Sequence, residues 1–167
     1  MTLYSELLLT HIPVAKAAML IRVPAAIVYN AVFDPQITTR FWFTRSTGRL
    51  EVGQQVRWDW EMYAVSSLVE VKALEPGKRI LVEWGVGKQP TMVEWIFSPK
   101  GENATFVSIT NTGFSGDGDS LVEQAMGSAA GFGLVLAGLK AYLEHGIELN
   151  LVADRFPEQW VDQQARH

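Results

Sequence analysis

Cysteine is absent from this 167-residue sequence. Its absence excludes disulfide bridges, thiol catalysis and cysteine-based zinc sites. Histidine is also scarce, and its three copies stand at none of the spacings that hold a metal with a neighbouring carboxylate: they are His11, His145 and His167. We therefore expect no metal and no cofactor.

Charged residues are few as well, at 19% of the chain, and the net charge is −4. The fourteen basic residues are scattered along the sequence, whereas binding to a phosphate backbone requires clustered Lys and Arg side chains. We therefore expect no nucleic acid partner.

Long hydrophobic runs are missing too. The run at residues 7–9 is too short for the apolar part of a signal peptide, and the run at 125–139 is shorter than a membrane-spanning helix needs. We expect a cytoplasmic protein without membrane insertion. With 48% hydrophobic residues, the chain can form one domain over residues 1–167. Its expected parts are a core at about 16–146, an extension at 1–15 and a tail at 151–167.

The start of the core predicts a strand followed by two short helices. An apolar run at 16–23 leads into Pro24, which suits the first position of a helix over residues 25–33. Asp34 and Pro35 then provide the cap and the first residue of a second helix that runs toward Trp42.

Between residues 51 and 114, short β-rich segments alternate with turns that contain Gly or Pro, which predicts an antiparallel meander. Pro76-Gly77 has the residues that a type II turn prefers. Apolar and charged residues alternate with period two, so one sheet face should be buried. The residues expected to face inward are Val56, Trp58, Trp60, Met62, Val69, Val71, Ala73, Ile80, Val82, Trp84, Val93, Trp95, Phe97, Val107, Ile109 and Asn111. The carboxylates expected to face outward are Asp59, Glu61, Glu70, Glu83 and Glu94.

A long helix is predicted from Ser120 to about Gly146, with Ser120 and Glu123 as a capping box. Its apolar stripe, at steps of three and four, consists of Leu121, Ala125, Ala129, Phe132, Leu136, Leu139 and Leu143. Glycine in a helix interior costs about 1 kcal/mol relative to alanine. Close approach to the sheet, a ligand or a partner is expected to compensate at the four glycines of this helix, Gly127, Gly131, Gly133 and Gly138.

Several segments carry a resemblance to a known family. They are residues 23–31 at the first helix, 40–43 after the second, the hairpin Glu75-Pro76-Gly77-Lys78-Arg79-Ile80, and 131–144 in the closing helix. Together they resemble the homologues of the heat-shock-protein ATPase activator, within the START-like superfamily, also called the helix-grip or birch-pollen-allergen fold. Phe132 stands where the family usually has Trp. The resemblance implies an α+β fold in which a curved antiparallel sheet of six or seven strands wraps around a long C-terminal helix and leaves a cavity.

Four of the six tryptophans lie on the predicted inner face. One interpretation is that they only fill a core. The other, which the implied fold favours, is that they line a cavity for a ligand. The candidate ligand-binding residues are Trp58, Trp60, Trp84, Trp95, Phe97, Asn111, Met126 and Phe132. Asn111 is the candidate polar anchor unless it bonds nearby backbone, and Tyr29 and Tyr63 are weaker candidates of the same kind.

No catalytic residue is assigned. Gly118-Asp119-Ser120-Leu121 matches the tetrapeptide of a serine-hydrolase family, but no Asp-x-x-His partner follows, and Ser120 is better explained as a helix cap. We expect non-catalytic binding or transport of a small hydrophobic or aromatic molecule. The alternatives are an enzyme of the cyclase/aromatase type found in the superfamily and a chaperone-associated interaction module. A second copy of the chain, in a homodimer, is the other candidate partner.

Overall fold

The computed structural model describes residues 7–161, so residues 1–6 of the expected extension and 162–167 of the expected tail lie outside the described residues. The helices and strands are β1 (Ala15–Ile21), α1 (Ala25–Phe33), α2 (Pro35–Thr38), β2 (Arg45–Ser46), β3 (Gln55–Trp60), β4 (Val65–Glu75), β5 (Arg79–Trp84), β6 (Thr91–Pro99), β7 (Thr105–Thr112) and α3 (Gly118–His145). Short 3-10 turns are η1 (Glu61–Tyr63), η2 (Ala153–Arg155) and η3 (Pro157–Gln159). The predicted opening of one strand and two helices is confirmed, although Pro24 is the N-cap of α1 and not its first residue.

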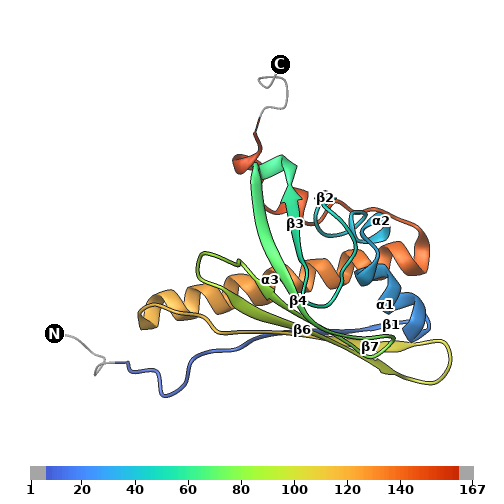
Figure 1. Ribbon diagram of the computed structural model, residues 1–167, viewed down its shortest axis with the longest axis horizontal. Coiled ribbons are helices and arrows are strands. Elements are labelled where there is room, and N and C mark those ends of the chain that lie inside the picture. Colours follow the sequence, from blue (N-terminus) through green and yellow to red (C-terminus); the bar gives the residue numbers. More distant parts are fainter. Residues whose placement is uncertain (1–6, 162–167) are drawn as a thin grey trace.

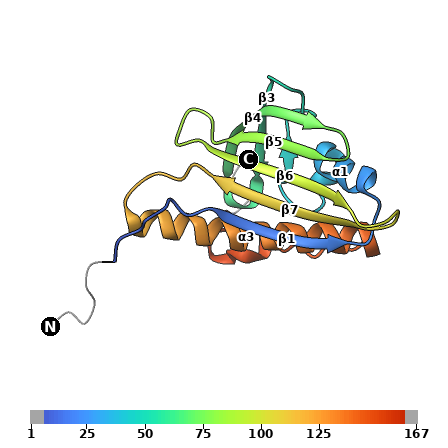
Figure 2. The same ribbon diagram turned by 90° about the horizontal axis from the view of Figure 1, so that it is seen from below.

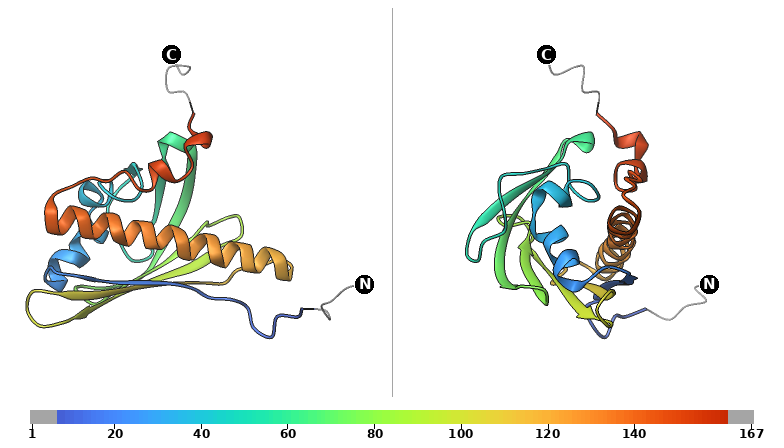
Figure 3. Two further views of the ribbon diagram at one scale, coloured as in Figure 1. Left: turned by 180° about the vertical axis from the view of Figure 1, so that it is seen from behind. Right: turned by 90° about the vertical axis from the view of Figure 1, so that its right-hand side faces the viewer.

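Within residues 7–161, seven strands form one antiparallel sheet in the order β1-β7-β6-β5-β4-β3-β2. Strands β2 to β7 follow one another as a meander, and β1 lies beside β7. Figures 1 and 2 show the sheet curving over α3, which runs along β1. The right-hand view of Figure 3 shows α1 and α2 at one end, between the sheet and α3. This arrangement is the predicted α+β helix-grip fold.

The inner face of the sheet follows the predicted period-two pattern. Its buried residues are Val56, Trp58, Trp60, Val69, Val71, Ile80, Val82, Val93, Trp95, Phe97, Val107, Ile109 and Asn111. On the outer face, the Lys72 ammonium lies 3.2 Å from the Glu70 carboxylate and 3.6 Å from that of Glu83. Arg79 donates to Glu94 at 2.7 Å. These carboxylates are therefore engaged in ion pairs on the outside of the sheet, as their spacing predicted.

Two details of that pattern are wrong. The register of β4 against β5 shifts between Val71 and Ala73, so Leu74 and not Ala73 pairs with the inward Ile80 and packs on the core. An extra residue in one strand exchanges the faces of all residues beyond it. Met62 lies in η1 and not on a strand, because the chain turns there between β3 and β4. It packs only partly against the core.

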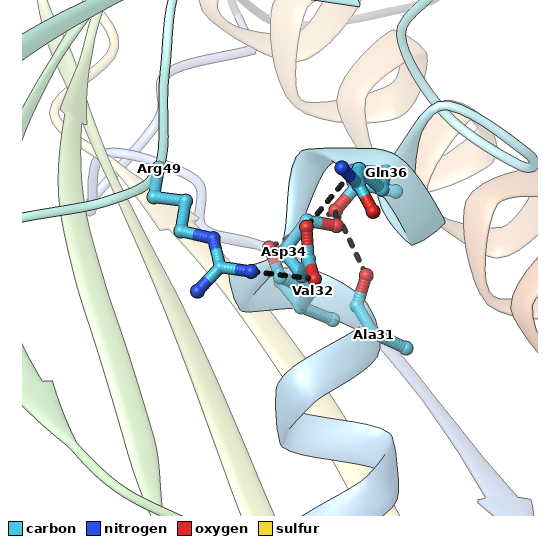
Figure 4. Close-up of polar contacts among 6 residues, drawn as sticks. Ala31, Val32, Asp34, Gln36 and Arg49 are labelled. Carbon is cyan, nitrogen blue, oxygen red and sulfur yellow. Dashed lines mark hydrogen bonds and ion pairs between the residues drawn. The ribbon is translucent and has the colours of Figure 1, made fainter.

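The junction of α1 and α2 is fixed by Asp34. Its carboxylate accepts a hydrogen bond from the Gln36 N–H at 3.0 Å and pairs with Arg49 at 3.2 Å (Figure 4). The hydroxyl of the fully buried Thr38 bonds back to carbonyl oxygens at the end of α1. Asp34 is therefore confirmed as the cap. Helix α2 ends at Thr38, so Trp42 lies in an irregular segment that precedes β2.

Helix α3 begins earlier than predicted. Asp117 is the N-cap, and its carboxylate accepts from the Ser120 N–H at 2.8 Å. Ser120 is therefore the third helical residue, and its hydroxyl contacts the Gln124 amide at 2.9 Å instead of forming the predicted capping box. The predicted end is confirmed, since Gly146 terminates the helix with a φ of +66° that favours glycine.

The apolar stripe of α3 packs on the sheet. Phe132, Leu136 and Leu139 are buried in the main core, and Leu143 packs on it in part. By length and composition alone, α3 could cross a membrane. Phe132, Leu136 and Leu139 of this helix are buried in the core, whereas Val122 and Met126 near its start are exposed.

The C-terminal end of α3 is tied to β1. The Lys140 ammonium donates to the Leu20 carbonyl at 2.9 Å and to the Glu144 carboxylate at 2.6 Å, and the Arg22 N–H donates to the same carboxylate at 3.1 Å. Burial alone would raise the pKa of Glu144, but the bonds from Lys140 and Arg22 lower it. The helix is thereby held along one edge of the sheet.

The glycines of α3 differ in their surroundings. A Cβ at Gly138 would lie 3.3 Å from Phe41 Cβ and 3.4 Å from the Phe41 carbonyl oxygen. A Cβ at Gly131 would lie 2.7 Å from Arg155 Nη1. A Cβ at either of the other two would meet no atom within 4 Å. Close approach therefore explains two of the four, and the approaching segments flank α3 and are not part of the sheet.

Substituting these glycines tests that distinction. We expect Gly133→Ala to raise the free energy of unfolding by about 0.5–1 kcal/mol, because alanine restricts the unfolded chain and meets free space in the folded one. The free energy of unfolding of Gly138→Ala should be lower than that of Gly133→Ala by at least about 1 kcal/mol, because the backbone at Phe41 must move. Urea denaturation of both variants measures the difference, and equal gains would contradict the packing described.

Candidate functional site

A cavity of about 650 Å³ lies between α3, the strands β3 to β7 and the C-terminal segment, residues 147–161. This volume falls within the range of roughly 300–1,000 Å³ that small-molecule sites occupy. The residues that line it are Trp42, Trp60, Tyr63, Val65, Ser66, Ser67, Trp84, Gly85, Lys88, Gln89, Thr91, Asn111, Gly127, Ser128, Gly131, Phe132, Leu134, Val135, Val152, Arg155, Phe156 and Gln159.

One wall of the cavity is aromatic. The rings of Trp60 and Trp84 lie parallel, with their centroids 5.7 Å apart and an interplanar angle of 3°. Phe132 on α3 meets Trp84 edge-on at 5.8 Å, and Trp42 meets Trp84 edge-on at 5.6 Å. Rings from β3, β5, α3 and the segment after α2 therefore converge on one surface, against which a flat apolar molecule can stack.

Four of the eight predicted ligand-binding residues lie together on this cavity: Trp60, Trp84, Asn111 and Phe132. The structure places the other four elsewhere. Trp58, Trp95 and Phe97 are on the inner face, as predicted, but other side chains cover them and they do not line the cavity. Met126 is 68% exposed, because it follows the buried Ala125 by one residue and so points away from the core.

Asn111 faces inward, as its position in the alternation predicts, and it is 5% exposed. Its amide nitrogen donates to the Met92 carbonyl at 2.9 Å, and its amide oxygen accepts from the Ser128 hydroxyl at 2.8 Å. Both polar atoms of the side chain therefore have partners within the protein. What remains for a ligand is the second amide hydrogen and the second lone pair of the amide oxygen, so Asn111 can orient a bound molecule only weakly.

The two candidate tyrosines have different surroundings. Tyr29 lies in the core, with its ring 5.5 Å from that of Phe97, and it does not line the cavity. Burial raises the pKa of its phenol. Tyr63 does line the cavity, and its hydroxyl is engaged by the C-terminal segment. Tyr63 is thus a structural contact for that segment.

The C-terminal segment forms a wall that the sequence did not predict. It leaves α3 after Gly146 and runs back past the open side of the sheet toward the β3–β4 connection (Figures 1 and 3). The Tyr63 hydroxyl is 2.9 Å from the Ala153 carbonyl and accepts from the Phe156 N–H at 3.2 Å. The Val161 N–H donates to the Met62 carbonyl at 2.9 Å. The signal for this wall in the sequence is the apolar content of residues 147–161, above all Phe156 and Trp160.

The charged groups on the cavity are both cationic. Lys88 is exposed on the β5–β6 loop, and Arg155 lies on η2. Among the described residues that line the cavity there is no Asp, Glu or His. Across residues 7–161, no group of three or more metal-ligating side chains could hold a metal ion. The lining can therefore stack, desolvate and attract an anion, but it offers no carboxylate or imidazole for proton transfer.

Comparison with known families identifies the family of this chain. Residues 22–144 match the family described as Activator of Hsp90 ATPase homolog 1-like protein. The chain belongs to this family. The match begins at Arg22, directly after β1, and covers α1, α2, strands β2 to β7 and nearly all of α3, but not the C-terminal segment that closes the cavity. No curated protein matches the chain.

Solved structures share the fold. A protein from Staphylococcus saprophyticus is 27% identical with a TM-score of 0.71, over 82% of this chain and 96% of that one. The Aha1 dimer from Colwellia psychrerythraea is 19% identical with a TM-score of 0.67, over 80% and 98%. The di-domain ARO/CYC protein BexL from the BE-7585A biosynthetic pathway is 18% identical with a TM-score of 0.66, over 79% of this chain and 46% of that one. The last two likenesses concern the fold alone.

In this family member, Tyr63→Phe should loosen the C-terminal segment. Removing the hydroxyl takes a partner from the Phe156 N–H and from the carbonyl oxygens of Val152 and Ala153, a loss of about 1–2 kcal/mol in local stability. Amide hydrogen exchange should report about tenfold lower protection at Phe156 and Val161, with the sheet unaffected. Tyr142→Phe, a change in α3 away from these bonds, is the matched control. Equal protection in both variants would show that Tyr63 does not hold the segment.

Proposed function

We propose that this protein binds a small apolar or aromatic molecule in the cavity between the sheet, α3 and the C-terminal segment, and carries it without transforming it. The observation that supports the proposal is open space of about 650 Å³ beside packed aromatic rings. In an ordinary core these rings would be covered on all sides, as Trp95 is. Trp60, Trp84 and Phe132 instead present surface to a cavity of ligand size.

Burial of the ligand would supply the affinity. An apolar molecule that loses about 200 Å² of exposed surface gains about 5 kcal/mol before the cost of immobilisation is subtracted. Stacking against Trp84 and Trp60 adds preference for flat, aromatic bodies. Hydroxyls of Ser67 and Thr91 on the lining can hydrogen-bond polar substituents and give orientation.

An enzyme of the cyclase/aromatase type is the main alternative, because one structure with this fold is the ARO/CYC protein BexL. Such chemistry needs a group that moves a proton at the ligand. The described lining offers Tyr63 and Lys88 but no carboxylate or imidazole, and the Tyr63 hydroxyl is already bonded to the C-terminal segment. These observations favour binding over catalysis.

A substitution that fills the cavity tests the proposal. Ser67 pairs with Trp58 across β3 and β4, lines the cavity and can be replaced by a larger side chain on a strand. We expect the neutral fluorophore N-phenyl-1-naphthylamine to bind the wild type with energy transfer from tryptophan. Ser67→Phe should weaken that binding by about tenfold or more, because its ring occupies the ligand's space.

The matched control is Ser108→Phe, the same change on the outer face of β7, where Ser108 pairs with Ala18 and Ile96. It should leave probe affinity unchanged, and circular dichroism should show both variants folded. Native mass spectrometry of the purified protein would show whether a molecule is retained. Wild-type affinity in Ser67→Phe, or no probe binding at all, would contradict a ligand site in this cavity.

The N-terminal segment suggests a second role, self-association. Leu7 is 89% exposed, Leu8 79% and Ile12 59%. Leu9 lies beside Gly118 at the start of α3, where Val122 and Met126 are also exposed. Exposed apolar side chains gathered in this way are typical of interaction surfaces, and the relative from Colwellia psychrerythraea is a dimer. We propose that this surface pairs two copies of the chain.

Sedimentation velocity tests the pairing. The wild type should sediment as a dimer, and the triple variant Leu7→Ser, Leu8→Ser and Ile12→Ser should sediment as a monomer, because apolar burial between the copies is lost. Binding of the fluorophore to the cavity should be the same in both proteins. A wild type that stays monomeric at high concentration would refute self-association, and it would not affect the cavity proposal.

A further inference from the structure

We infer that the molecule bound in this cavity carries an anionic group on its apolar body, and that Arg155 and Lys88 receive that group at the cavity rim. The inference rests on the proposed function, since it concerns the same cavity. It adds the chemical class of the ligand, an aromatic or alicyclic acid, and the two side chains that select it.

Arg155 is held in place before any ligand arrives. Its Nη2 donates to the Gly127 carbonyl at 3.1 Å, and its guanidinium carbon lies 4.8 Å from the centre of the Phe156 ring. Its Nη1 occupies space next to Gly131, 2.7 Å from where a Cβ would stand. The guanidinium therefore lies along α3, bonded to the Gly127 carbonyl and in space that the absence of a side chain at Gly131 leaves open. A group fixed in this way loses little conformational entropy when it binds.

The fixed guanidinium has donors to spare. An Arg side chain has five N–H groups, and the structure gives one of them a partner, the Gly127 carbonyl. None of the ion pairs formed among residues 7–161 includes Arg155 or Lys88. Arg79 and Lys72 on the outer face, in contrast, each pair with two carboxylates. Both cations on the cavity are thus without a carboxylate partner among the described residues and can pair with an anion.

The charge of the cavity lining is positive, whereas the net charge of the whole chain is negative. The sequence has 18 acidic and 14 basic residues, yet the described lining has two cations and no carboxylate. A concave site with walls of low dielectric constant concentrates the field of the charges on its rim. Such a site attracts anions and repels cations, and the aromatic wall then holds the apolar part of the molecule.

The geometry of the guanidinium narrows the anion to a group with two or three acceptor oxygens. A carboxylate or sulfonate can accept two parallel N–H bonds from Arg155, and the Lys88 ammonium can reach the same group as a flexible point charge. Because the rim is open to solvent, the anion keeps part of its hydration and avoids the cost of full burial. An apolar acid fits both halves of the site.

Two probes with the same aromatic body separate charge from shape. 8-Anilinonaphthalene-1-sulfonate carries a sulfonate, and N-phenyl-1-naphthylamine is its neutral counterpart. We expect the wild type to bind the sulfonate about tenfold more tightly than the neutral probe at low salt, and this preference should shrink as sodium chloride screens the rim charges. Ser67→Phe, which fills the cavity, should weaken the binding of both probes. That result would place their binding site in the cavity.

Substitutions at the rim test the two cations. Gly131→Ala keeps the Arg155 charge but displaces the guanidinium, and its matched control is Gly133→Ala, which meets no atom. Lys88→Gln removes the loop charge, with Lys78→Gln in the distant β4–β5 turn as its control. Gly131→Ala and Lys88→Gln should each lower the preference for the sulfonate about threefold or more without weakening the neutral probe, and the controls should leave it unchanged.

The outcomes are distinguishable. Equal affinity of the wild type for the two probes would overturn the anionic class of the ligand and leave the proposed cavity function standing. A sulfonate preference that survives both rim variants would overturn the assignment to Arg155 and Lys88. Failure of both probes to bind would overturn the proposed function itself, and this inference with it.

Discussion

The cavity depends on the position of one indole ring. The centroid of Trp42 lies between 4.9 and 5.8 Å from those of five other rings, which belong to Phe43, Trp58, Trp84, Trp95 and Phe132. These rings come from the segment after α2, from β3, β5 and β6, and from α3. Aromatic pairs contribute about 0.5–1.5 kcal/mol each beyond their buried area. Trp42 therefore joins the sheet to the helix and separates a filled core, which contains Trp95, from the open space beside Trp84.

The open space exists because α3 covers only part of the curved sheet. The ties from Lys140 and Glu144 hold the helix along β1, while α1 and α2 fill one end of the groove. The inner surface near β3 to β5 is left without a helix above it. The C-terminal segment closes this side, and it is held there by few bonds, chiefly through the Tyr63 hydroxyl and the Val161 N–H. A wall with few contacts can open more easily than the core.

The faces of the sheet could be predicted from the sequence because side chains on a strand alternate strictly, and one buried face imposes apolar residues at every second position. That reasoning placed Trp60, Trp84 and Asn111 correctly on the inner face. It missed the shift at Ala73, because a bulge without Gly or Pro leaves no local signal. The prediction that Met126 faces the ligand was wrong by one helical position. One position corresponds to about 100° of rotation, which is enough to turn a side chain from core to solvent.

Trp42 and Arg155, in contrast, could not have been found from periodicity. Each lies in a segment without regular structure or in a single 3-10 turn, where no repeat relates one residue to the next. Their places depend on tertiary contacts: five rings for Trp42, and a carbonyl, a ring and a glycine for Arg155. Two of the contacts that make the candidate site most specific therefore come from the parts of the chain that sequence patterns describe least well.

The glycines of α3 connect this site to the stability of the helix. Gly131 is required by the guanidinium next to it, but a Cβ at Gly127 would meet no protein atom. Gly127 nevertheless lines the cavity, so a side chain there would extend over the rim and would not clash with the protein. Glycine costs the helix about 1 kcal/mol of stability relative to alanine at both Gly127 and Gly131. At Gly127, no close packing against the protein offsets that cost. The loss at Gly127 is explained once the rim has to remain open beside a fixed cation, which is the condition for an anionic molecule to enter.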